Sequence, residues 1–281
     1  MSAPTTLGRR FEQAPDIAAF LAIWLEERGL LQGAPAQTFD TYYASFRRSF
    51  PPRMRRFYRD QIAEAGALTK PGRRLLEIGC GLGTESLWLA LQGAHVMAVD
   101  VREDRLAAAR ERHAVLQREL GRNLFCHFSH ASVLDLPEHA TFDLIWMEQT
   151  FHHLEPRADV VRKVASLLAP GGHVVISEAN AWNVPLQAQL LLRRGLPRVE
   201  MLDMGEGRKH PYGVERITTA AAIRAAFAGE GVQPLSVRHF RMFPNHALFD
   251  LLAPLEAAAS LKGMPFLYTH FNYVGERPAA P

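Results

Sequence analysis

The stretch Leu75-Leu-Glu-Ile-Gly-Cys-Gly-Leu-Gly-Thr84 carries the strongest structural signal in the chain. A short apolar run leads into three glycines at alternate positions, and helix-forming residues follow them. Glycine lets the backbone turn sharply and approach a ligand closely. The helix that begins behind the loop presents free backbone N–H groups toward such a ligand. The stretch therefore predicts a strand, a ligand-binding turn and a helix in succession.

Asp100 supplies the second signal. It follows the apolar run His95–Val99, and it lies 17 residues after Gly83. A carboxylate at the end of the second strand can accept hydrogen bonds from both hydroxyl groups of a ribose. The two features together predict a nucleoside ligand at the carboxyl edge of a parallel sheet, where α/β folds bind ligands.

The rest of the chain alternates between strand and helix patterns after Arg73. We expect strands at residues 74–78, 95–99, 123–128, 142–147, 173–177, 233–242 and 267–274, and helices at residues 84–92, 103–120, 157–168, 218–229 and 246–261. Alternation of this kind indicates βαβ units and a doubly wound, Rossmann-like α/β sheet with helices on both faces.

Two segments do not fit the sheet. Residues 1–70 have helical spacing and many arginines, and we expect them to form an N-terminal cap on a main domain that spans residues 71–281. Residues 180–216 contain no clear strand pattern, and we expect them to form a second cap inserted into that domain. A long segment that does not belong to the sheet is usually functional.

Composition excludes several classes of protein. Two cysteines cannot build a disulfide framework or a cysteine-rich zinc site, and we predict no metal site. A net charge of +3 is too small to indicate a nucleic-acid partner. The longest apolar run, Ile17–Leu25, is far shorter than the roughly 20 residues of a membrane span. We therefore expect a cytoplasmic protein without a membrane span.

The spacing of the glycines distinguishes two classes of nucleoside ligand. A dinucleotide fingerprint would require glycine at position 84, which is Thr84 here. Glu77 would be unfavourable beside a pyrophosphate, but it suits an ammonium group. In order behind the loop stand Asp100, Phe142-Asp-Leu-Ile145, His152-His-Leu154 and Leu168-Ala-Pro-Gly-Gly172. With these motifs the chain resembles the class I S-adenosylmethionine-dependent methyltransferases, in the small-molecule branch of the ubiquinone-biosynthesis type, over residues 75–178.

The resemblance implies a seven-stranded sheet with its last strand antiparallel, and S-adenosylmethionine as cofactor. It also implies roles for individual residues. The methionine part of the cofactor would contact Glu77, Gly79, Cys80 and Gly81, and the ribose would contact Asp100. The adenine would contact Val101, Ser132 and Val133. The sulfonium would lie beside Glu148 and Gln149. Many family members have an acid near the adenine amine; here the matching position is Ser132, with Asp135 as the alternative.

The expected reaction is methyl transfer to a small molecule by in-line displacement, which depends mainly on alignment and exclusion of water. For a hydroxyl acceptor, the candidate bases are His152, His153 and Glu148. A packing role for the histidines is the alternative. Tyr42, Tyr43 and His210 are the candidate acceptor contacts.

The acceptor itself is less defined. Arginines gather in residues 47–59 and 193–209, which indicates either an acidic or phosphorylated acceptor or a solvated helix face. Three other functions stay open: an RNA methyltransferase, a nicotinamide-dependent oxidoreductase, and a non-catalytic adaptor with this fold. The sequence does not predict the oligomeric state.

Overall fold

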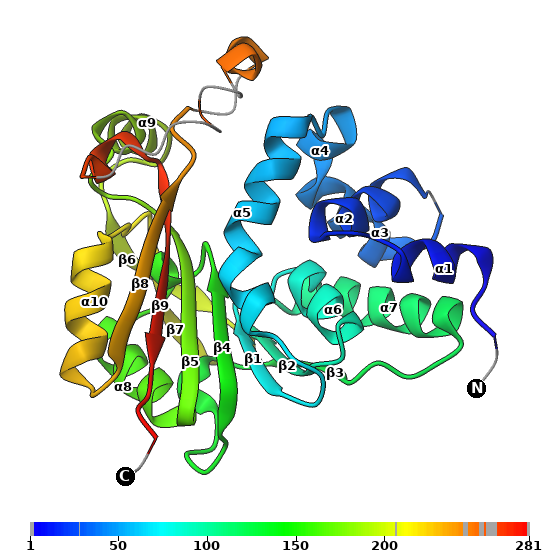
Figure 1. Cartoon of the computed structure of the whole chain (residues 1–281), viewed down its shortest axis with the longest axis horizontal. Coiled ribbons are helices and arrows are strands. Elements are labelled where there is room, and N and C mark those ends of the chain that lie inside the picture. Colours follow the sequence, from blue (N-terminus) through cyan, green and yellow to red (C-terminus); the bar gives the residue numbers. More distant parts are fainter. Residues whose placement is uncertain are drawn as a thin grey trace. The chain divides into compact units, whose positions relative to one another are not determined.

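The structure is a computed structural model that describes residues 3–27, 29–205, 207–243, 247–252, 256 and 263–279. The chain divides into two compact units, Met1–Ser132 and Val133–Pro281 (Figure 1). Each unit contributes strands to the main sheet and is described by itself below.

Unit 1 combines the N-terminal helices with the first three strands. Its elements are α1 (Thr6–Glu12), α2 (Ile17–Glu26), α3 (Gly33–Tyr42), α4 (Ala44–Arg48), α5 (Pro52–Leu68), β1 (Arg74–Ile78), α6 (Thr84–Leu91), β2 (His95–Asp100), α7 (Glu103–Leu120) and β3 (Cys126–His130). The strands pair in parallel in the order β3-β2-β1. Crossover helices join them, as parallel pairing requires.

The N-terminal helices are built into unit 1. Asp16 caps α2, because its side chain accepts a hydrogen bond from the Ala19 N–H. The rings of Phe11, Phe20 and Trp24 then meet in a buried cluster, with centroids 5.0–6.4 Å apart. At the start of α1, the Thr5 N–H donates to the Glu119 carbonyl of α7 at 2.9 Å. These helices therefore share the apolar core of α7 and the sheet.

Unit 2 carries the remaining strands. Its elements are η1 (Val133–Asp135), β4 (Phe142–Glu148), η2 (Phe151–His153), α8 (Arg157–Leu167), β5 (Leu168–Ala179), α9 (Val184–Arg194), β6 (Arg198–Asp203), β7 (Lys209–Val214), α10 (Ala220–Gly229), β8 (Gln233–Phe240), η3 (Ala247–Leu252), η4 (Pro265–Leu267) and β9 (His270–Glu276). The order is β4-β5-β9-β8, and β9 runs antiparallel to both neighbours. Helices α8 and α10 pack side by side on these strands (Figure 1).

The main sheet thus has seven strands, with the last one antiparallel, which confirms the predicted fold class. Several boundaries differ from the prediction. The third strand is Cys126–His130 instead of 123–128, and the last is His270–Glu276 instead of 267–274. The helix expected at 246–261 lies largely outside the described residues; within that range, 247–252 form the short helix η3.

The prediction for residues 180–216 was wrong in one respect. The segment folds into the helix α9 and the antiparallel pair β6 and β7, which forms a separate two-stranded sheet. These two strands are half exposed, so their sequence lacks the apolar alternation of a core strand. Within the described residues, no helix is both long and apolar enough to cross a membrane.

Candidate functional site

The glycine loop of unit 1 has the conformation that its sequence predicts. Gly79, Gly81 and Gly83 have φ angles of 76°, 52° and 68°, in the left-handed region that favours glycine. The Gly79 and Cys80 N–H groups donate to the Val99 carbonyl at 2.8 and 3.1 Å, which fixes the loop against β2. The loop is therefore held by its backbone.

The Asp100 side chain binds the backbone of this loop. One carboxylate oxygen accepts the Gly81 N–H at 2.8 Å, and the other accepts the Arg102 N–H at 2.8 Å. Burial raises the pKa of Asp100, against the opposing effect of backbone donors at Gly81, Arg102 and Val101. An ionised carboxylate has about four lone-pair sites, so it can accept a further donor such as a ribose hydroxyl group.

Glu77 and Cys80 support the loop from inside the unit. The buried Glu77 carboxylate accepts a short hydrogen bond from the Ser86 hydroxyl of α6. Burial raises the pKa of the Cys80 thiol well above its ordinary value, with a further contribution from Glu77 and Asp100. Cys80 is therefore a neutral, buried side chain, and its backbone is the part that belongs to the loop.

The two tyrosines predicted to contact the acceptor lie beside the same loop. The Tyr42 hydroxyl lies 3.3 Å from the place that a Cβ on Gly81 would occupy, and the Tyr42 side chain is 46% exposed. Tyr43 is buried, and its hydroxyl lies 2.6 Å from Thr84 Oγ1. Tyr42 is thus placed to contact a ligand on the loop, whereas Tyr43 attaches α3 to the start of α6.

Arg112 completes that attachment. Its Nη1 donates to the Leu82 carbonyl at 2.6 Å and to Thr84 Oγ1 at 2.8 Å. The fully buried guanidinium lies over the Trp24 ring, 4.6 Å from its centroid, and over the Phe39 ring at 5.2 Å. Arg112 therefore connects α2, α3 and α7 to the glycine loop.

Two other predicted contacts of unit 1 follow its strands. The Val101 carbonyl, just after β2, accepts a hydrogen bond from the His130 ring at 3.1 Å. Ser132 is buried two residues after β3. Val133, predicted to act beside Ser132, is the buried first residue of η1 in unit 2.

In unit 2, the predicted base His152 is paired with a carboxylate. His152 Nδ1 lies 2.9 and 3.0 Å from the two carboxylate oxygens of Glu178, at the end of β5. The Ala179 N–H and the His152 N–H also donate to this carboxylate. Both side chains are buried. Glu178 therefore fixes the ring and holds the hydrogen on Nδ1, which leaves the lone pair on Nε2.

The pairing raises the pKa of His152 and lowers the pKa of Glu178. Burial alone would lower the pKa of His152, but the Glu178 carboxylate outweighs it, and the pKa is raised. Burial would raise the pKa of Glu178, but the facing His152 outweighs it, and the pKa is lowered. Glu178 thus stabilises the protonated form of His152.

His153, the second candidate base, contacts the β6–β7 hairpin. Its Nδ1 donates to the Gly213 carbonyl at 2.7 Å, and its ring stacks on Tyr212 with centroids 4.4 Å apart. A Cβ on Gly213 would lie 2.5 Å from the His152 carbonyl oxygen. His153 therefore fastens the β6–β7 hairpin to η2. His210, on the same hairpin, is buried, and burial lowers its pKa.

Glu148 and Gln149 stand at the carboxyl end of β4, as predicted. The Glu148 carbonyl accepts the Thr150 hydroxyl at 2.9 Å. Gln149 has a φ of 46°, and its N–H donates to the Ser177 carbonyl. Its buried Nε2 has no hydrogen-bond partner in the described part of the chain. A strained backbone and an unpaired buried donor are features of functional sites.

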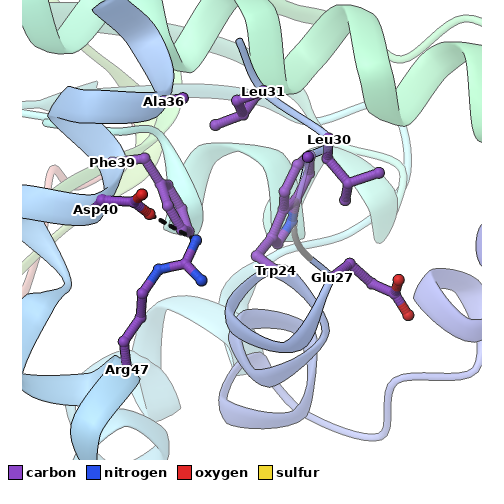
Figure 2. A pocket seen from close by; sticks show the side chains of 9 residues that line it. Trp24, Glu27, Leu30, Leu31, Ala36, Phe39, Asp40 and Arg47 are labelled. Atoms are coloured by element: carbon purple, nitrogen blue, oxygen red, sulfur yellow. Dashed lines mark ion pairs between the residues drawn. The ribbon is translucent and has the colours of Figure 1, made fainter. Parts of the chain in front are cut away.

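One pocket of unit 1 contains none of the predicted site residues. It is lined by Trp24, Glu27, Gly29, Leu30, Leu31, Ala36, Phe39, Asp40 and Arg47. Figure 2 shows the Trp24 and Phe39 rings on its walls and the Arg47–Asp40 ion pair, 2.7 Å long, beside Phe39. The pocket is thus lined by α2, α3, α4 and the loop that joins α2 to α3.

Comparison with known proteins decides the family. The family model described as a methyltransferase domain matches residues 50–252, which is more than half of the chain. The chain belongs to the class I S-adenosylmethionine-dependent methyltransferases. The predicted resemblance is thereby confirmed, together with the cofactor of the family.

Individual relatives match only part of this chain. The chain is 34% identical over 113 residues to a ubiquinone biosynthesis O-methyltransferase of Marinobacter nauticus, and the match covers 39% of this chain and 45% of the relative. It is 36% identical over 126 residues to a demethylmenaquinone methyltransferase of Clavibacter sepedonicus, covering 44% and 46%. The chain spans about half the length of the curated relatives it matches.

Solved structures share the fold of this methyltransferase. Magnesium protoporphyrin IX methyltransferase from Synechocystis PCC 6803, solved with bound S-adenosylhomocysteine, superposes with a TM-score of 0.55 at 15% identity, over 93% of this chain and all of that one. At such low identity the likeness concerns the fold.

The residues of this methyltransferase fit S-adenosylmethionine. The Asp100 carboxylate, which accepts backbone N–H groups, is the kind of group that also accepts ribose hydroxyl groups. Above Gly81 of the same unit, the nearest atoms to a Cβ would be those of the Tyr42 side chain, which begin at 3.3 Å. The glycine loop and Asp100 of unit 1 thus offer groups that match the family cofactor.

The sequence analysis did not single out two residues of these arrangements, Glu178 and Arg112. Glu178 follows directly after the expected fifth strand, so the convergence of parallel strand ends could have indicated it as a partner of the loop after β4. Arg112 lies in a charged helix pattern in which nothing in the sequence sets it apart, and the structure alone shows that it is buried.

Proposed function

We propose that this methyltransferase transfers a methyl group from S-adenosylmethionine to a hydroxyl group of a small molecule, with His152 as general base. The observation that carries the proposal is the bond between His152 Nδ1 and Glu178, which presents Nε2 as the proton acceptor. A hydroxyl acceptor needs such a base, because its oxygen must lose a proton as it is alkylated.

The cofactor, when bound, supplies an activated methyl group on a positively charged sulfur. The contribution of the chain lies in its own groups. Nε2 of His152 takes the hydroxyl proton as the new oxygen–carbon bond forms and the sulfur–carbon bond breaks. The carboxylate of Glu178 stabilises the imidazolium that results, and its bonds to the His152 and Ala179 N–H groups keep it in place.

The names of the relatives support a hydroxyl acceptor, since the Marinobacter protein is called an O-methyltransferase. Three of the six arginines at residues 47–59 pair with acids of their own unit, which weakens the case for an acidic or phosphorylated acceptor there. Arg47 pairs with Asp40, Arg56 with Asp60, and Arg59 with Asp16. A neutral hydroxylated acceptor therefore fits these observations better. Tyr42 and His210 stay our predicted acceptor contacts.

The test combines cofactor binding with turnover. Calorimetry measures binding of S-adenosylmethionine, and mass spectrometry detects methylation of a panel of phenols and catechols. We expect His152→Gln to bind the cofactor as the wild type does and to lose turnover by about 10²- to 10⁴-fold. The exposed His139 gives a matched control, His139→Gln, with unchanged turnover. Full turnover by His152→Gln would refute the proposal.

A further inference from the structure

Large exposed apolar side chains gather on one part of unit 2. Of the fourteen in the described part of the chain, nine come from two short segments: Trp182, Val184, Leu191, Leu192, Leu196, Val199, Met201, Met264 and Phe266. We call these nine residues the apolar patch. Scattered exposed apolar residues are normal on a protein, but their concentration in two segments joined by hydrogen bonds marks an interaction surface.

Helix α9 contributes the centre of the patch. None of its residues, all of which the structure describes, is buried. Leu186 and Leu190, four positions apart, are half-buried, whereas Val184, Ala188, Leu191 and Leu192 follow the opposite, exposed face. Leu192 is 87% exposed and Val184 is 72% exposed. Helix α9 therefore has an apolar face that its own unit does not cover.

Hydrogen bonds hold the segment of Met264 and Phe266 beside the start of α9. The Asn180 side chain donates to the Pro265 carbonyl at 2.8 Å, and the Asn183 side chain donates to the Phe266 carbonyl at 2.9 Å. Figure 1 shows this segment, in red, next to α9. Met264 and Phe266 thus extend the surface that Trp182 and Val184 begin.

Basic residues accompany the patch. Arg193 and Arg194 end α9, Arg198 begins β6, and Arg208 and Lys209 lie at the far end of the hairpin. Two of these arginines are shared with acids: Arg194 lies 3.5 Å from Glu215, and Arg198 lies 2.6 Å from Glu200. The surface is thus apolar with a moderate positive charge.

We propose that the apolar patch inserts into the surface of an anionic lipid bilayer. An exposed apolar helix face with arginines at its border and with Trp and Phe side chains is the composition of an interfacial membrane surface. A second copy of the chain fits less well, because a two-fold contact through this face would bring like-charged arginines together. Anionic lipid headgroups complement the same arginines.

The hairpin gives the proposal a consequence for catalysis. Its inner strand β7 is fastened to η2 by His153 and Gly213, and η2 carries His152. Docking through α9 and β6 would therefore bring the bilayer to the element that holds the base. This consequence rests on the proposed function, whereas lipid binding itself does not.

Co-sedimentation with vesicles tests lipid binding without any turnover. We expect the full chain to bind vesicles of phosphatidylcholine and phosphatidylglycerol, and to bind pure phosphatidylcholine more weakly. The double variant Leu192→Glu and Leu196→Glu is expected to lose affinity by about tenfold or more, because two apolar side chains leave the bilayer. Arg193→Gln is expected to lose about fivefold on the anionic vesicles only.

The matched control is Leu235→Glu, since Leu235 on β8 is 52% exposed and lies outside the patch. It should bind vesicles as the wild type does. Absence of binding, or an equal loss in this control, would overturn the proposal. So would a concentration-dependent dimer, seen by light scattering, that Leu192→Glu dissolves, because the patch would then contact a second copy. Cofactor binding by the same variants separates these outcomes from a failure of the proposed function.

Discussion

Asp100 is the residue on which the assignment of the ribose depends. Replacing it by Asn keeps the size of the side chain but removes the charge, so bonds to the cofactor hydroxyl groups weaken. We expect Asp100→Asn to weaken binding of S-adenosylmethionine by about 10- to 100-fold, or roughly 1.5–3 kcal/mol. Calorimetry checks this. Asp104→Asn, at an exposed acid paired with Arg102, is the control and should bind normally; an equal effect in both would disprove the assignment.

Glu178 sets the pH dependence of the base. Without its carboxylate, burial, which lowers the pKa of His152, loses its main opposing effect. The neutral imidazole is the active form, so the rate rises as the pH passes this pKa. We expect Glu178→Gln to show that rise at a lower pH than the wild type, with a maximal rate about 10²-fold smaller. A pH–rate profile measures both. An unchanged profile would mean that His152 does not accept the proton.

The same pair gives stability a defined pH window. The raised pKa of His152 contributes stability below about 6.5, which is lost as the pH rises through the raised value. The lowered pKa of Glu178 contributes stability above about 4.5, which is lost as the pH falls through the lowered value. The advantage of the wild type over Glu178→Gln should therefore be greatest between these values, at about 3 kcal/mol in urea unfolding.

At the scale of elements, Gly83 controls how closely α6 approaches β3. A Cβ there would lie 2.5 Å from the Phe128 ring, and φ is 68°. We expect Gly83→Ala to lower the free energy of unfolding by about 2–4 kcal/mol, from overpacking and backbone strain together. Gly231→Ala isolates the strain, because Gly231 also has positive φ but no atom within 4 Å of its Cβ. Equal losses of melting temperature would rule out the contact with Phe128.

Elements could be predicted from the sequence where the signal was local. The glycine loop and Asp100 are close in the chain, and their geometry follows from strand, turn and helix in succession. The partnership of His152 and Glu178 could not be predicted in that way, because it depends on the pairing of β4 with β5 across 26 positions. Helix α9 and the β6–β7 hairpin escaped because exposed elements lack the apolar periodicity on which prediction relies.

At the scale of the whole molecule, the N-terminal helices belong to unit 1, the same unit as the glycine loop. A separate cap, as the sequence predicts for residues 1–70, could be removed without loss of cofactor binding. The contacts of unit 1 argue for the opposite outcome. Thr5 bonds to Glu119, a Cβ on Gly8 would lie 2.0 Å from the Glu119 carbonyl oxygen, and Trp24 packs under the buried Arg112. Arg112 in turn holds Leu82 and Thr84 of the loop.

Deletion of residues 1–40 would therefore expose Arg112 and remove the ring of Phe39 beside it. We expect the truncated chain to melt well below the full chain and to lose binding of S-adenosylmethionine, because the buried guanidinium would no longer hold the glycine loop. Removal of residues 1–3 alone should change neither the melting temperature nor the calorimetric affinity, because the first of these backbone contacts begins at Thr5. If the chain from residue 41 onward bound the cofactor normally, the helices would be an independent cap, and Arg112 would not be needed to shape the loop.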